Sequence, residues 1–155
     1  MSDVMRWRYG DTQPVVAPVD STTVIEIGDL VYWDGDDAKP ASLQPDQGNE
    51  AANQQLFASK FLGVAMQRSP AGSANPIRVA TAGVFEFPTP ETTLQLGDWV
   101  GVDENDAGTA LENQRLVKVT VADNAVGRVV RAASGTVWVA VCSTIMAGGV
   151  KGTTA

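Results

Sequence analysis

The chain has 155 residues, of which 44% are apolar and 19% charged, and its formal net charge is -7. The length fits one domain, and the apolar fraction is too high for a disordered chain. The negative charge disfavours nucleic-acid binding because it repels phosphate. The sequence has no histidine and one cysteine, which excludes Ser-His-Asp and Cys-His catalysis, histidine-ligated zinc and a disulfide scaffold.

The first 20 residues predict an extended N-terminal arm, because Pro14 and Pro18 flank a valine-rich stretch that has no turn of its own. Residues 1–10 lack the apolar core of a signal peptide. No apolar run in the sequence reaches the about 20 residues of a membrane-spanning helix. We therefore expect a soluble protein that is made in a cytoplasm and has no membrane or nucleic-acid partner.

The arm carries the one patch that is both basic and aromatic, formed by Arg6, Trp7, Arg8 and Tyr9. Arginine and aromatic side chains are enriched at interface hot spots. One interpretation is an anchor that docks onto a partner, and the other is that Trp7 folds back onto its own domain. We favour docking, since an unpaired tryptophan in a loose chain end is an unusual exposure.

An internal repeat organises the rest of the chain, since residues 25–31 (IEIGDLV) match residues 94–100 (LQLGDWV). The following features recur in the same order: an acidic turn (34–37 and 103–106), a glycine within an apolar strand (Gly63 and Gly127), and an alternating strand (77–82 and 136–141). We expect two related units at about 22–88 and 92–146. Two units are too few for a solenoid, so they predict one all-β barrel or sandwich over residues 21–146.

The first unit has two insertions, near residues 44–60 and at residues 67–76. The stretch 49–59 (NEAANQQLFAS) predicts the only helix, a short surface helix capped by Asn49 with Leu56 and Phe57 as anchors. Residues 147–155 are small and predict a flexible tail.

The two Gly-Asp pairs, Gly28 with Asp29 and Gly97 with Asp98, each stand between apolar stretches. Glycine permits a sharp bend and aspartate binds nearby backbone amides, so we interpret both pairs as structural turns.

No catalytic or metal site is expected, and no cofactor. The acidic turn from Asp34 lacks the glycine and glutamate that a helix-flanked calcium loop needs at positions six and twelve, and the turn from Asp103 lacks the glutamate. A solvated turn is favoured for both, with a weak calcium site as the alternative.

Glu86 and Glu91 are the best pair for a two-carboxylate hydrolase, yet Glu86 alternates with phenylalanines along a strand and is expected to face outward. Cys142 lies among apolar neighbours and is expected to be a buried small hydrophobe.

The order of these motifs resembles the small capsid decoration, or cement, proteins of tailed bacteriophages, a family once labelled predicted phage recombinase. The resemblance covers residues 20–146. It is carried by the following segments: IGDLVYWD (27–34), LGVA (62–65), AGVFEFP (82–88), LGDWV (96–100), VGR (126–128) and the terminal strand VWVAV (137–141). The two insertions and the long arm depart from the family pattern.

The resemblance implies a non-enzymatic virion protein on the outer capsid surface, where it bridges neighbouring major capsid proteins as a homotrimer. Residues 6–9 would then be the capsid anchor, and Phe85 and Phe87 would be exposed at the trimer interface. Two alternatives stay open. One is a tail or baseplate barrel that binds host glycan through Trp33 or Trp99, and the other is a small hydrolase that uses Glu86 or the aspartate clusters.

Overall fold

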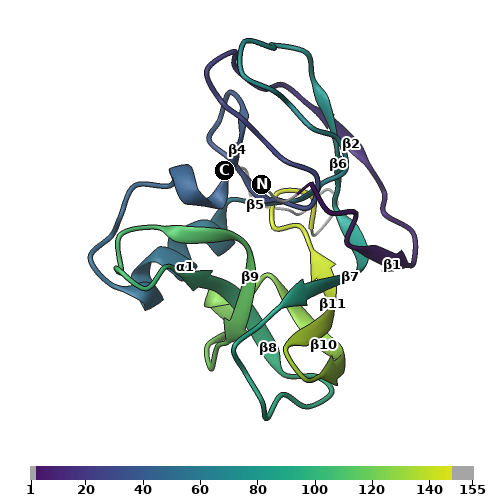
Figure 1. Cartoon of the computed structure of the whole chain (residues 1–155), viewed down its shortest axis with the longest axis vertical. Helices are drawn as coiled ribbons and strands as arrows, with labels where there is room; N and C mark the ends of the chain where they lie inside the picture. Colours follow the sequence, from purple (N-terminus) through teal and green to yellow (C-terminus); the bar gives the residue numbers. More distant parts are fainter. Residues whose placement is uncertain (1–2, 148–155) are drawn as a thin grey trace.

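The computed structural model describes residues 3–147 as two antiparallel sheets with one α-helix (Figure 1). The five-stranded sheet contains β2 (Val15–Ala17), β3 (Leu30–Trp33), β4 (Ala38–Pro40), β5 (Phe61–Ala65) and β6 (Ile77–Ala80). The six-stranded sheet contains β1 (Trp7–Tyr9), β7 (Ala82–Pro88), β8 (Trp99–Glu104), β9 (Leu111–Lys118), β10 (Gly127–Ala133) and β11 (Thr136–Cys142). The all-β prediction is confirmed.

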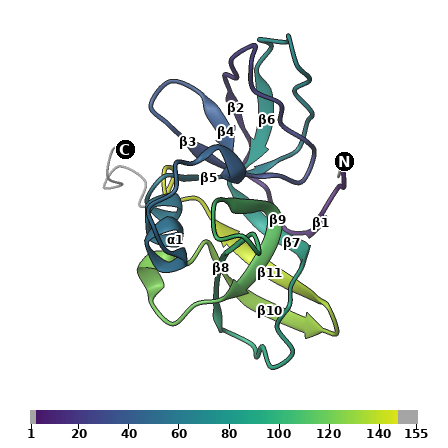
Figure 2. The same ribbon diagram turned by 60° about the vertical axis from the view of Figure 1, so that its left-hand side comes forward.

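Both sheets have the same strand order, so the internal repeat of the sequence corresponds to a repeat in the fold. The strands of one follow the order β2-β6-β5-β3-β4, and those of the other follow β7-β11-β10-β8-β9 with β1 added outside β7. In Figures 1 and 2 the first sheet forms the upper part of the molecule and the second forms the lower part. The structural units therefore begin at β2 and at β7, earlier in the chain than the two sequence motifs.

The two Gly-Asp pairs form the same turn. Gly28 and Gly97 have φ angles of 96° and 88°, in the left-handed region that favours glycine. In each turn the aspartate carboxylate accepts a hydrogen bond of 2.9 Å from the backbone N–H three residues earlier. Each glycine N–H then donates to the partner strand, at 2.9 Å to Ala65 and 2.8 Å to Val129.

Two further glycines occupy equivalent places where strands approach closely. A Cβ atom at Gly63 would collide with the backbone carbonyl of Ala80, and one at Gly127 would collide with that of Ala140. These are the glycines that the sequence repeat places inside apolar strands.

The helix α1 (Glu50–Ser59) confirms the predicted helix, and the Asn49 side chain caps it by accepting a hydrogen bond of 2.9 Å from the Ala52 N–H. Phe57 is fully buried in the main core, and Gln54 Nε2 donates to the Val102 carbonyl of β8 at 3.0 Å. The helix and the short 3-10 turn η1 (Ala41–Leu43) fill the connection from β4 to β5. The equivalent connection in the second unit holds the 3-10 turn η2 (Ala122–Asn124).

Phe85 and Phe87 are fully buried, so the expectation that they are exposed at an interface is wrong. Strand β7 is paired on one side with β11 and on the other with β1. Its alternation turns both rings into the main core, while Glu86 between them faces the other side of the sheet.

The described helix α1 is too short and too polar to cross a membrane, and no other described helix could do so. The predicted flexible tail lies outside the described residues, apart from Ala147.

Candidate binding surface

The N-terminal segment, which is the described part of the predicted arm (residues 3–20), is extended, and hydrogen bonds join it along its length to its own domain. The Val4 N–H donates to the Ile27 carbonyl at 2.9 Å, and the Arg6 carbonyl accepts from Glu86 N–H at 2.9 Å. Further along, the Thr12 carbonyl accepts from the Thr81 N–H at 2.9 Å. Strand β1 pairs with β7, and β2 pairs with β6. These contacts fix the backbone of the segment in one position.

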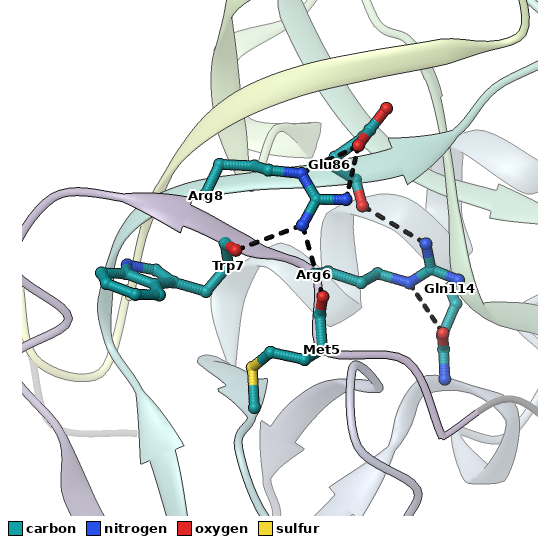
Figure 3. A network of polar contacts seen from close by, with 6 residues as sticks. All are labelled: Met5, Arg6, Trp7, Arg8, Glu86 and Gln114. Carbon is teal, nitrogen blue, oxygen red and sulfur yellow. Dashed lines mark hydrogen bonds and ion pairs between the residues drawn. The ribbon is translucent and has the colours of Figure 1, made fainter.

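Arg6 joins the segment to β7 and β9 of the second unit (Figure 3). Its Nε donates to Gln114 Oε1 at 2.7 Å, and its Nη1 donates to the Glu86 carbonyl at 3.3 Å. The guanidinium lies 5.4 Å from the ring centroid of Phe87. Partial burial, and next the nearby Arg8, lower the pKa of Arg6. The guanidinium therefore serves an internal contact.

Gln114 links Arg6 to the first Gly-Asp turn, because its Nε2 donates a hydrogen bond to Asp29 Oδ1 at 2.8 Å. Asp29 is almost fully buried, and the burial raises the pKa of its carboxyl. Arg6, Gln114 and Asp29 also line a pocket of about 650 Å³ beside the end of β7. The described residues contain no group of three or more acidic or cysteine side chains that could hold a metal ion.

Arg8 and Glu86 form an ion pair across β1 and β7 (Figure 3). The Arg8 Nε and Nη2 both donate to Glu86 Oε1, at 2.9 Å and 2.6 Å. The hydrogen bonds from Arg8 lower the pKa of Glu86. Glu91, in contrast, accepts from the Lys118 N–H at 2.8 Å. Each member of the expected carboxylate pair thus has its own structural contact.

Trp7 and Tyr9 present their side chains to solvent, at 41% and 51% exposure. The Trp7 Nε1 donates to the Gly10 carbonyl at 2.9 Å, which holds the indole against its own strand. The Tyr9 ring lies 6.2 Å from that of Trp138. Among residues 3–147, half of the exposed large apolar side chains are in this N-terminal segment: Val4, Met5, Trp7, Tyr9 and Val16.

A second group of side chains, which the sequence reasoning missed, lies on the outer face of the six-stranded sheet. Arg131 is paired across strands with Trp138, and Arg128 with Trp99. Each guanidinium lies over its partner's ring, at 5.0 Å and 5.4 Å from the centroid. Directly paired residues face the same side of a sheet. The alternation of residues 136–142 could have shown this face, had the inward valines been used to orient the strand.

Cys142 lies at the end of β11 and is exposed, so the expectation that it is buried is wrong. Strand β11 alternates inward valines with outward residues, and Cys142 falls on the outward register.

The other predicted candidates serve structural contacts. Trp33 is half-buried against the second core cluster, and Trp99 is half-buried beneath Arg128. Asp103 binds Arg115 at 3.0 Å, and Asp34 binds Lys39 at 3.0 Å.

Comparisons of the chain with protein-family models, with curated proteins and with solved structures found no match.

Proposed function

We propose that the chain is a non-enzymatic capsid decoration protein, which binds the outer surface of a phage capsid as a trimer and bridges neighbouring major capsid proteins. The observation that carries the proposal is the pair of exposed aromatic side chains, Trp7 and Tyr9, on a strand whose backbone is fixed to the domain. The motif order of residues 20–146 supports the choice of partner by resemblance.

A fixed strand favours binding because little conformational entropy is lost when it docks. Large aromatic side chains supply most of the binding energy at many protein interfaces. Strand β1 is also an edge strand of its sheet, so its outer side is open to a partner. The anchor in this proposal is the pair Trp7 and Tyr9, while Arg6 and Arg8 position the strand.

Binding to a mature lattice and not to its dissociated subunits would stabilise the shell by mass action. Three copies held together would raise retention further, because each new contact becomes intramolecular.

The test uses expanded capsids made from the major capsid protein of the phage that would encode this chain, with the chain added back. Wild type is compared with a Trp7→Ser, Tyr9→Ser double variant, and occupancy is measured by electron microscopy. Leu96→Ser is the matched control, since Leu96 is 80% exposed in the loop between β7 and β8. Deletion of the segment is unsuitable because it would also uncover the β7 edge.

We expect the double variant to lose occupancy while the control decorates the shell as wild type does. Full occupancy of the double variant would reject the anchor, and no binding by the wild type would reject capsid decoration. Glycan binding through Trp7 and Tyr9 without capsid binding would favour a tail or baseplate module.

A further inference from the structure

The outer face of β8, β10 and β11 concentrates positive charge on an acidic protein. We define the arginine–tryptophan face as Trp99, Arg128, Arg131 and Trp138. Both arginines are exposed, and within residues 3–147 neither forms a salt bridge. The whole chain carries a formal charge of -7, so the remaining surface is more negative than the total.

The two guanidinium groups of this face are held in positions from which they can donate hydrogen bonds to a partner's carboxylates. A guanidinium over an indole ring is held by the cation–π interaction, and its N–H edge stays free to donate to a carboxylate. Holding the group in place also reduces the entropy lost on binding. Arg128 is fixed further by its Nε, which donates to the Gly97 carbonyl at 2.9 Å.

A hollow of about 280 Å³ lies beside this face, lined in part by Trp99, Arg128 and Cys142. The face therefore offers both charge and a depression that a partner's side chain could enter. Nucleic acid is a poor occupant, because the strongly acidic remainder of the chain would repel its phosphates.

The same chain carries a patch of opposite charge in the β3–β4 hairpin. We define the acidic turn as Asp34, Asp36 and Asp37, with Asp20 nearby. The pKa of Asp37 is raised, first by partial desolvation and then by the carboxylates of Asp20, Asp34 and Asp36. Asp34 is engaged by Lys39 and by backbone N–H groups, which leaves the exposed Asp36 and the half-buried Asp37 as the carboxylates that a partner could bind.

The two patches lie on different sheets. In Figures 1 and 2 the β3–β4 hairpin is in the upper part of the molecule, and β10 and β11 are in the lower part. One chain therefore cannot bring its own acidic turn onto its own arginine–tryptophan face.

We infer that the arginine–tryptophan face of one copy binds the acidic turn of a second copy. Such a contact joins two different surfaces, so it is heterologous and closes into a ring when the rotation permits, as in a trimer. The inference rests on the trimer of the proposed function and names its subunit contact, in place of the buried Phe85 and Phe87. It adjoins the capsid anchor at Tyr9, which touches Trp138.

The test is a charge exchange in solution, without capsids. One variant carries Arg128→Glu and Arg131→Glu, and the other carries Asp36→Lys and Asp37→Lys. Arg78→Glu is the matched control, because Arg78 is an exposed arginine on the other sheet that forms no salt bridge within residues 3–147. Sedimentation velocity measures association over a range of protein concentrations.

We expect wild type and Arg78→Glu to self-associate. The association constant of each double variant should be lower than that of wild type by a factor of about ten or more. An equimolar mixture of the two double variants restores association, because each reversed patch then meets its complement. Raising the salt from about 0.02 M to about 0.5 M weakens wild-type association, since exposed charges are screened. Alkylation of Cys142, which lines the hollow, slows as wild-type association increases.

A wild type that stays monomeric at every concentration would overturn the inference, as would association that both double variants retain. Failure of the two folded double variants to associate with each other would overturn it as well. If either variant fails to fold by circular dichroism, the neutral changes Arg128→Gln with Arg131→Gln, or Asp36→Asn with Asp37→Asn, test the loss of association in place of the charge reversals. Shell occupancy is measured separately, so an anchor failure and a subunit-contact failure are distinguishable.

Discussion

Asp29 and Asp98 occupy the same position of the same turn, but only Asp29 is covered by the other unit. Asp29 Oδ1 accepts from Gln114 Nε2 of β9 at 2.8 Å, whereas Asp98 Oδ2 lies 3.5 Å from the exposed Lys118 Nζ. The duplication thus produced two copies of one turn, and the association of the units buried one of them. We therefore expect substitution of these two equivalent residues to destabilise the protein by different amounts.

Asp29→Ala should destabilise the protein more than Asp98→Ala. The first change removes the 2.8 Å acceptor of the buried Gln114 Nε2 and leaves a turn N–H without its acceptor, at a cost of about 2–3 kcal/mol. The second removes one turn acceptor at the surface, at about 1 kcal/mol. Urea unfolding of both variants measures the difference, and equal losses would contradict the assigned role of Gln114.

Asp29 and Asp34 should change stability in opposite directions with pH. Burial raises the pKa of Asp29 in the folded state, so its contribution is fully present below the unfolded pKa of about 3.9 and is lost as pH rises through the raised folded pKa. For Asp34, burial opposes ionisation, but the N–H groups of Asp37 and Asp36 and the Lys39 ammonium outweigh it and lower the pKa to about 2. The contribution of Asp34 is present above about 3.9 and is lost as pH falls toward about 2.

The measurement is the free energy of unfolding of wild type, Asp29→Asn and Asp34→Asn from neutral pH down to the acid limit of folding. We expect the advantage of wild type over Asp29→Asn to grow as pH falls, and its advantage over Asp34→Asn to shrink. Slopes of the same sign for both variants would show that one assignment is wrong.

Arg6→Met should cost more stability than Arg8→Met. The half-buried Arg6 bridges β1 to Gln114, and its loss removes hydrogen bonds that hold β1 to β7 and β9, at about 1–2 kcal/mol. Arg8 forms a partly exposed ion pair with Glu86 at the surface, and such pairs contribute about 0–1 kcal/mol. Thermal unfolding in low and high salt separates them, because salt should reduce only the Arg8 effect.

Phe85→Ala should destabilise the fold by about 3–5 kcal/mol, as large core truncations do. Tyr9→Ala, on the neighbouring strand, should change stability by less than about 1 kcal/mol because its ring is half exposed. Chemical denaturation of both variants measures these losses. A loss below about 1 kcal/mol for Phe85→Ala would contradict the burial of Phe85 in the core.

Local sequence signals predicted those parts of the fold that short-range chemistry determines. The helix and its Asn49 cap, the Gly-Asp turns and the glycines at close strand approaches all depend on neighbouring residues. Pairing of β1 with β7 could not be predicted this way, because Trp7 and Phe85 are far apart in sequence and β1 has three residues.

Alternation gave the period of β7 but left its orientation open. An outward Glu86 requires inward Phe85 and Phe87, so the two expectations made for this strand could not both hold. The arginine–tryptophan face was missed for a related reason: Arg128 and Trp99 belong to different strands, and only their pairing brings them together.

A reconstruction of the decorated, expanded capsid by electron microscopy would show directly whether β1 attaches the protein to the shell. We expect β1 to face the shell and the density for Trp7 and Tyr9 to contact the major capsid protein. Shells that bind no copies, or copies that bind with β1 turned toward solvent, would contradict this expectation.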